Sequence, residues 1–178
     1  MPTTQREFKP ELMDIMADGS KLLWAESYDE KDQRTMVFTT AYLLTILSLC
    51  HKASVDGTFF IMSKWGICHD TIVIIFYAFR LWRQCFIMMG HFGGSWIPIA
   101  FGYLPTKEIA SYDSFFTLLT KLMSDNLGST TTNLKKILCD FEKGIHIAIN
   151  KVYEGKVKIQ GCFFHFSSCI WKKYKNQP

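Results

Sequence analysis

Two aspartates stand in apolar segments of this 178-residue chain, where a charge is costly unless it has a partner. Asp56 lies within residues 53–62, whose β-branched and aromatic side chains predict a strand. Asp140 ends the apolar run 136–140, and open α/β sheets build their sites at the carboxyl ends of strands. Each acid also has a plain structural interpretation. Asp56 would face water on an edge strand beside a glycine bulge, and Asp140 would cap the N-terminus of the next helix.

The two aspartates are more informative together than singly. Adjacent strands would bring both carboxylates to one rim of a sheet, where their mutual repulsion favours a divalent cation between them. Oxygen ligands of this kind suit Mg²⁺ or Mn²⁺. A two-ion version can activate a water, and then a DNA 3′ hydroxyl, for in-line attack on a phosphodiester. Asp56 and Asp140 therefore permit metal-dependent phosphoryl transfer.

Three further residues carry functional groups. Cys162 and His165 form a Cys-x2-His unit at the end of a third predicted strand, 156–164. Two ligands are too few for structural zinc, which takes four, and the spacing alone favours a buried cysteine beside a packed histidine. Glu142 follows Asp140 by two residues, so on a helix it points away from it and suits the positive end of the helix dipole.

The elements that position these residues are indicated by periodicity and by turn residues. Residues 39–50 predict a buried helix and residues 107–123 an amphipathic one. Gly93-Gly94 predicts the turn of a hairpin whose second strand, containing Pro98, is irregular or near an edge. From residue 53 the predicted order is strand, hairpin, helix, strand, helix, strand, helix. This order implies an α/β fold, with helices packed on one sheet.

Composition and charge narrow the class of protein. With 48% hydrophobic residues, the chain can bury one core and form a single domain. Six scattered cysteines without a CxxC pair favour a reducing compartment. The apolar run 36–50 is too short to span a membrane, and the run 71–90 is interrupted by Arg80 and Arg83. Seven lysines after residue 142 suit a phosphate partner, or form a solvated face.

Several short blocks follow one another along the second part of the chain. They are FTT at 38–40, VDGTF at 55–59, the segment 96–105 followed by Lys107, DFEK at 140–143, and GCFFHF at 161–166 with WKK at 171–173. In order and rough spacing, from about residue 35 to the C-terminus, they resemble the catalytic domain of Mutator-like (MULE) transposases.

This resemblance implies an RNase H-like α/β fold, a mixed sheet flanked by helices, and DDE-type cleavage and transfer of DNA strands. It assigns Asp56 and Asp140 as the first two catalytic acids and as ligands of Mg²⁺ or Mn²⁺. Cys162 and His165 match an element that supports the active site in the family. The basic C-terminal face, with Lys172, Lys173 and Lys175, is then expected to bind DNA.

The residue pattern and the resemblance together set the expected domain boundaries. Residues 1–35 are expected to be a polar lead-in with a short helix near 10–16, and residues 36–178 a partial transposase domain with an atypical apolar insertion at 63–85. The proline expected soon after DGTF is missing. The chain stops before the last catalytic helix, which carries the third acid, so by itself it is expected to be inactive.

Transposon ends and target DNA are the expected partners, self-association is left open, and no membrane is expected. The nucleus is the expected compartment, with the cytoplasm as the alternative. A degenerate DNA-binding protein without catalysis is the alternative function.

Overall fold

The computed structural model describes residues 4–7, 9, 21–58 and 82–175. The expected helix near residues 10–16, residues 59–62 of the first predicted strand and most of the 63–85 insertion lie outside this part of the chain.

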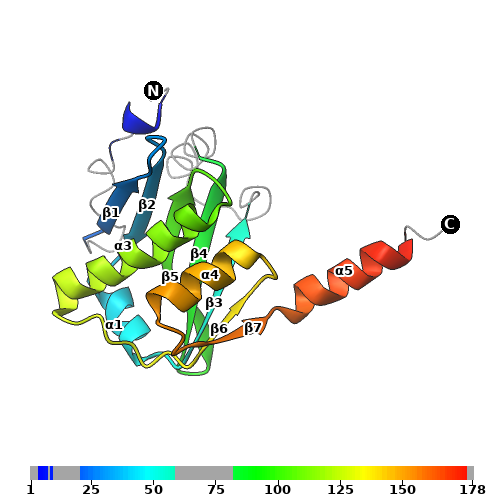
Figure 1. The fold of residues 1–178 in the computed structure, drawn as a ribbon. Coiled ribbons are helices and arrows are strands. Elements are labelled where there is room, and N and C mark those ends of the chain that lie inside the picture. The colour runs from blue at the N-terminus through cyan, green and yellow to red at the C-terminus, as the bar shows by residue number, and fades with distance from the viewer. Residues whose placement is uncertain (1–3, 8, 10–20, 59–81, 176–178) are drawn as a thin grey trace, which may run out of the picture.

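The described residues form an α/β protein with one seven-stranded mixed sheet and four α-helices (Figure 1). The strands are β1 (Leu23–Tyr28), β2 (Arg34–Thr39), β3 (Lys52–Thr58), β4 (Gln84–Phe92), β5 (Ser95–Leu104), β6 (Lys136–Cys139) and β7 (Lys158–Gly161). The helices are α1 (Ala41–Leu49), α3 (Ile109–Leu127), α4 (Lys143–Val152) and α5 (Phe163–Lys175), and a 3-10 helix, η1, spans Gln5–Glu7. The predicted α/β class is confirmed.

The strands lie in the order β1-β2-β5-β4-β3-β6-β7. β6 runs parallel to β3 and to β7, whereas the other neighbouring pairs are antiparallel. β3 is therefore an interior strand, at which the antiparallel part of the sheet meets the parallel part.

The predicted hairpin is confirmed as β4 and β5. Gly93 and Gly94 form its turn with φ of 57° and 82°, values that favour glycine. The expected irregularity at Pro98 is a register shift between Met88 and Met89 on the opposite strand. β5 is not an edge strand. Its pairing with β2 covers residues 101–103, so Pro98 lies outside the segment in which β2 requires an N–H donor.

Beyond the predicted elements, β1 and the first two residues of β2 fall in the stretch expected to be a polar lead-in. Neither follows from composition, because β1 is only partly buried and mixes apolar with polar residues. The buried Arg34 stabilises this hairpin through an ion pair with Glu26 on β1. Arg34 Nη1 also donates to the backbone oxygen of Gln5, at 2.6 Å. The polar composition of residues 1–35 therefore did not predict β1 or the start of β2.

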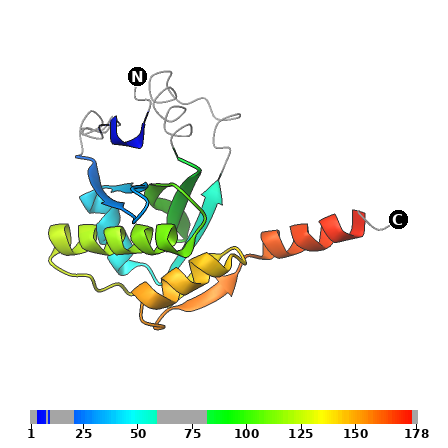
Figure 2. The ribbon, with the colours of Figure 1, turned by 45° about the horizontal axis from the view of Figure 1, so that its top comes forward.

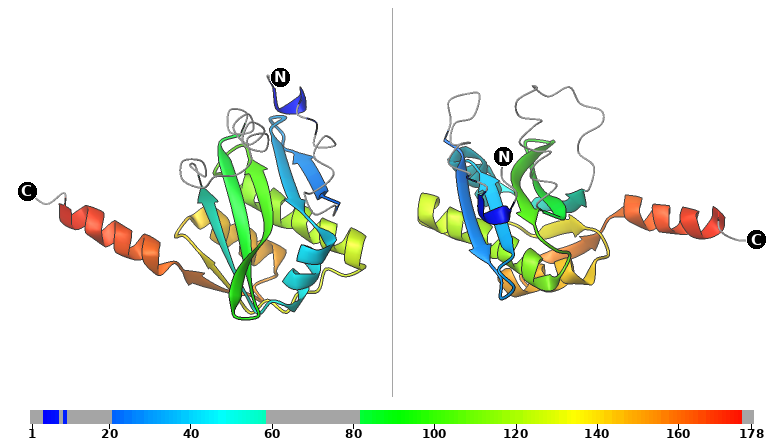
Figure 3. Two further views of the ribbon diagram at one scale, coloured as in Figure 1. Left: turned by 180° about the vertical axis from the view of Figure 1, so that it is seen from behind. Right: turned by 90° about the horizontal axis from the view of Figure 1, so that it is seen from above.

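The sheet buries side chains on both faces. α3 and α4 cover one face, as the opposite views in Figures 1 and 3 show, and the main core lies beneath them. Val37 of β2 points into this core, while Met36 and Phe38 join a smaller cluster with Trp82 and Tyr103. Because successive side chains of a strand point to opposite faces, this second cluster lies on the other face of the sheet.

α5 begins at Phe163, whereas the sequence predicts a strand as far as residue 164 and a helix from Ser167. The strand prediction is wrong at this end because β6 ends at Cys139, opposite Gly161, and offers β7 no further residues to pair with. α5 contains no buried residue and projects from the body of the protein (Figure 2). No helix in the described segments is long and apolar enough to cross a membrane.

Candidate functional site

A polar pocket of about 220 Å³ lies at the carboxyl ends of the parallel strands β3 and β6. It contains three acids, together with donors and acceptors from other elements. Its lining residues are Asp56, Gly57, Gln84, Lys107, Asp140, Glu142, Ile145 and His165. Both aspartates singled out in the sequence thus line one pocket.

The register of β3 and β6 explains why the two aspartates meet. Ser54 pairs with Leu138, so continuing this parallel register by two residues places Asp56 opposite Asp140. Neighbouring strands lie roughly 5 Å apart. β6 ends at Cys139, which leaves β3 with β4 as its neighbour at Asp56 and opens the sheet at this point.

The edge-strand interpretation of Asp56 is right in part: Asp56 is exposed and, among the described strands, β3 pairs only with β4 at this residue, but β3 as a whole is an interior strand and has no bulge beside Gly57. β3 lies between β4 and β6, and its register against β4 runs without a bulge from Lys52 to Thr58. Val55 is buried and Asp56 is exposed, as the alternation of a strand requires.

The helix-cap interpretation of Asp140 is also wrong. α4 begins at Lys143 with Glu142 at its cap position, and no side chain caps its first turn. Asp140 Oδ1 instead accepts from the Phe141 N–H at 2.6 Å and lies 3.9 Å from His165 Nδ1. His165 reaches this position because α5 starts directly after β7. The carboxylate of Asp140 is consequently available to the pocket and not to the helix.

Glu142 faces the pocket, contrary to the prediction that it points away from Asp140. The prediction assumed helical geometry, but Glu142 has φ −73° and ψ 116°, which is extended backbone. Its Oε1 accepts from Lys107 Nζ at 2.9 Å and its Oε2 accepts from the Tyr112 hydroxyl at 2.5 Å. Hydrogen bonds from Lys107 and Tyr112 therefore fix the position of the Glu142 carboxylate.

The environment of Asp56 disfavours its charged form. Although Asp56 is exposed as a residue, its carboxyl group is partly enclosed by the pocket, and this desolvation raises its pKa; the nearby carboxylates of Asp140 and Glu142 raise it further. His165 and the Gly57 N–H act in the opposite direction and lower this pKa. The net direction is upward, so an ionised Asp56 would gain from a bound cation.

The raised pKa of Asp56 predicts a pH-dependent gain in stability for Asp56→Asn. A carboxyl that holds its proton more tightly in the folded state stabilises the fold at acid pH, and this contribution is lost as pH rises through the folded pKa. Asparagine cannot ionise, so it removes the free-energy cost of holding a charged carboxylate at position 56 at neutral pH. Because Asp56 is exposed to solvent, we expect a gain below about 1 kcal/mol at pH 7. In a chain of this size that is about 3 °C or less in Tm.

Thermal unfolding of both proteins at pH 7 and pH 3.5 measures this difference. The higher Tm of Asp56→Asn relative to the native chain should be present at pH 7 and absent at pH 3.5. A gain of equal size at both pH values would contradict the assignment.

The other residues proposed from the sequence lie outside this pocket. Cys162 stands between β7 and α5, and its N–H donates to the Cys139 backbone oxygen at 2.9 Å. The structure therefore brings His165 to the acids, but not Cys162. Lys172, Lys173 and Lys175 occupy the last turn of α5 and are exposed. Lys172 lies roughly 10 Å along the helix axis from His165.

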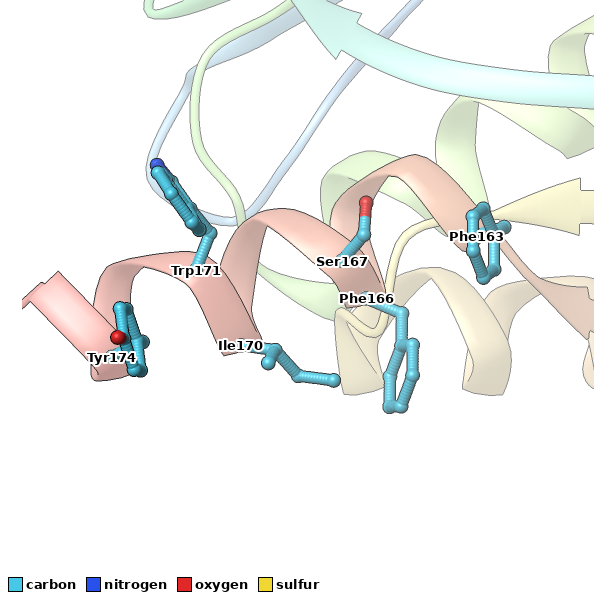
Figure 4. A pocket seen from close by; sticks show the side chains of 6 residues that line it. All are labelled: Phe163, Phe166, Ser167, Ile170, Trp171 and Tyr174. Atoms are coloured by element: carbon cyan, nitrogen blue, oxygen red, sulfur yellow. The ribbon is translucent and has the colours of Figure 1, made fainter.

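The exposed apolar side of α5 is a second surface feature. Its hollow is lined by Phe163, Phe166, Ser167, Ile170, Trp171 and Tyr174 (Figure 4). The rings of Trp171 and Tyr174 stack with centroids 6.0 Å apart, and Lys175 Nζ lies 5.4 Å from the Trp171 ring centroid. This end of the helix combines aromatic faces with positive charge.

Gln84 and Tyr112 contribute to the pocket or to its hydrogen bonds without any sequence pattern that assigns them a role, whereas Lys107 had one signal, its place after the block 96–105. Their partners are 28 to 35 residues distant in the chain. Glu142 had one usable signal, its place in the block DFEK.

Within the described residues, no group of three or more histidine, cysteine, aspartate and glutamate side chains is arranged to hold a metal ion. No family model, curated protein or solved structure matches this chain.

Proposed function

We propose that this chain is a transposase-derived domain of the DDE type with an RNase H-like fold. In this proposal Asp56 and Asp140 hold Mg²⁺ or Mn²⁺ for cleavage of DNA strands, the first step of the cleavage and transfer that a complete DDE domain carries out. The observation that carries the proposal is the register of β3 and β6, which aligns the two carboxylates at the open end of a pocket. Two such acids lower their mutual repulsion by sharing a cation.

The arrangement of the sheet supports the RNase H-like part of the proposal. Three antiparallel strands, β5, β4 and β3, continue into the parallel strands β6 and β7. The first acid lies on the interior strand where the two parts join, and the second follows its parallel neighbour. This is the arrangement expected of an RNase H-like sheet with its acids at one end.

The donor set of the pocket suits a hard cation that keeps part of its hydration shell. Asp56 and Asp140 supply two carboxylates, whereas both oxygens of Glu142 already accept hydrogen bonds. Mg²⁺ is commonly bound through one or two carboxylates, with waters and substrate phosphates as its other ligands. Two carboxylates are therefore enough to hold such an ion, while a closed zinc site would need more ligands.

In the proposed mechanism, a bound ion would supply an activated water and charge stabilisation at the phosphate. The protein groups fix the carboxylates around it. The Phe141 N–H, which donates to Asp140 Oδ1 at 2.6 Å, limits the rotation of that carboxylate. The hydrogen bonds from Lys107 and Tyr112 hold Glu142 at the wall of the pocket. Transfer of a cleaved end to target DNA is not expected, because a third free carboxylate is not among the described pocket residues.

Nicking of supercoiled DNA in the presence of Mn²⁺ tests this function. Nicking that is abolished by Asp56→Asn and by Asp140→Asn supports the catalytic proposal. Asp125→Asn makes the same change at an exposed position of α3 and should leave nicking unchanged. DNA binding without nicking would overturn the catalytic proposal in favour of a DNA-binding protein.

The alternative function, DNA binding without catalysis, is favoured by the basic end of α5. Lys172, Lys173 and Lys175 are exposed there beside aromatic rings, which suits contacts with phosphates and bases. Replacing all three lysines with glutamine should weaken DNA binding. It should also reduce the slope of log K against log salt by about 0.9 for each lost phosphate contact.

Fluorescence anisotropy of a labelled duplex, measured at several salt concentrations, gives this slope. The matched control replaces three exposed lysines outside α5, Lys121, Lys135 and Lys158. Equal slopes for the two triple variants would show that the charge of α5 has no special role.

A further inference from the structure

Gln84, the first residue of β4, is a buried polar side chain in the wall of the pocket. It is 1% exposed and lines the same space as Asp56 and Asp140. A buried amide is costly when its donors or acceptors lack partners. The position of each end of this amide therefore bears on what the pocket binds.

The oxygen end of the Gln84 amide faces Tyr112. The Tyr112 hydroxyl lies 3.3 Å from Gln84 Oε1 and 2.5 Å from Glu142 Oε2. Burial and the bond to Glu142 raise the pKa of Tyr112, so the phenol keeps its proton and remains a donor. Glu142 is in turn paired with Lys107. These contacts hold the Gln84 amide beside the Tyr112 hydroxyl.

The nitrogen end of the amide lies over Gly57, next to Asp56 in β3. A Cβ at position 57 would come within 1.8 Å of Gln84 Nε2 and 2.7 Å of Gln84 Cδ. A side chain at position 57 would therefore occupy the place of the amide. Among the described residues, Gln84 Nε2 makes no hydrogen bond to a protein acceptor, and it is not one of the fully buried polar atoms, so it is accessible from the pocket. The amide N–H groups are thus open to the pocket and unpaired with protein in the described segments, although the rest of the Gln84 side chain is buried.

We infer that Gln84 is a substrate-contacting residue, whose Nε2 donates a hydrogen bond to a non-bridging phosphate oxygen of DNA in the pocket. This inference rests on the proposed function, because three acids would repel a phosphate unless a cation were bound at Asp56 and Asp140. A neutral amide suits this position. It offers a donor to the phosphate without the positive charge that would repel the cation.

Gln84→Met tests the inference, because methionine has a similar length but no N–H donor. Free Mn²⁺ is measured first by electron paramagnetic resonance, and Mn²⁺ affinity should stay within about twofold of the native value, since the carboxylates are untouched. Binding of a labelled DNA duplex is then measured by anisotropy with and without saturating Mn²⁺. We expect the Mn²⁺-dependent part of DNA binding to weaken about tenfold, the effect of one hydrogen bond to a charged group.

Gln160→Met, an exposed glutamine on β7, is the matched control and should bind both Mn²⁺ and DNA as the native chain does. If Gln84→Met does not unfold cooperatively, Gly57→Ala serves instead, because its methyl group displaces the amide and leaves Gln84 in the sequence. It should lower the Mn²⁺-dependent DNA affinity in the same way.

The outcomes separate the inference from the proposed function. If the native chain binds no Mn²⁺, the proposed function fails and the inference fails with it. If Mn²⁺ and DNA both bind, and Gln84→Met binds DNA as tightly as the native chain does, the inference alone is overturned. A loss of DNA binding with unchanged Mn²⁺ affinity supports both.

Discussion

Asp56→Asn and Asp140→Asn should each weaken Mn²⁺ binding by at least about 100-fold. Substituting a residue that only hydrogen-bonds to a metal ligand costs about 10- to 100-fold in metal affinity. Loss of a direct ligand should cost at least as much. The two carboxylates lie opposite each other in the continued register of β3 and β6, and each asparagine removes one negative charge from that pair. Titration of free Mn²⁺ by electron paramagnetic resonance measures the change directly.

Thermal unfolding gives a second measurement of the same effect. A ligand at 100 times its Kd stabilises the native state by about 2.7 kcal/mol. Such a concentration of Mn²⁺ should raise the Tm of the native chain and of the Asp125→Asn control. The two pocket variants should gain little, although Asp56→Asn is expected to start from a slightly higher Tm at neutral pH. Equal Mn²⁺ stabilisation of all four proteins would place the ion elsewhere and remove the basis of the proposed function.

Phe86→Ala should lower the free energy of unfolding by about 3–5 kcal/mol, the usual cost of truncating a buried phenylalanine. Phe86 is fully buried on β4 and contacts three rings of α3. Their centroids lie 5.2 Å (Tyr112), 4.9 Å (Phe115) and 6.2 Å (Phe116) from that of Phe86. These contacts join the sheet to α3, so the cavity left by the alanine side chain would lie in the centre of the main core.

Urea unfolding monitored by circular dichroism measures this loss. Phe92→Ala is the control, because Phe92 lies at the end of the same strand and is 39% exposed. It should cost much less. A loss below about 1 kcal/mol for Phe86→Ala would contradict the packing described for α3.

The core and the pocket are connected through Tyr112. Its ring packs against Phe86, while its hydroxyl binds Glu142 and lies near Gln84. We therefore expect that Phe86→Ala, at a urea concentration where it is still folded, holds the side chains of Glu142 and Gln84 less firmly in the pocket than the native chain does. The main core stabilises the candidate site as well as the fold.

Local sequence patterns determined the elements whose stability depends on local geometry. The apolar residues of α1 and α3 recur at helical spacing, and the φ values of Gly93 and Gly94 are those that a two-residue hairpin turn needs. β3 and β6 were predictable from short apolar runs. β1 was not, because its stability comes from pairing with β2 and from the ion pair between Glu26 and Arg34.

The sequence by itself determined that Asp56 and Asp140 are acids in apolar surroundings, each with more than one interpretation. Only the tertiary structure placed them in one pocket, because the register of two strands more than 80 residues apart decides which side chains meet. The same applies to Gln84 and Glu142. Spacing along the chain could not predict their contacts with Tyr112, since these contacts depend on how α3 packs against the sheet.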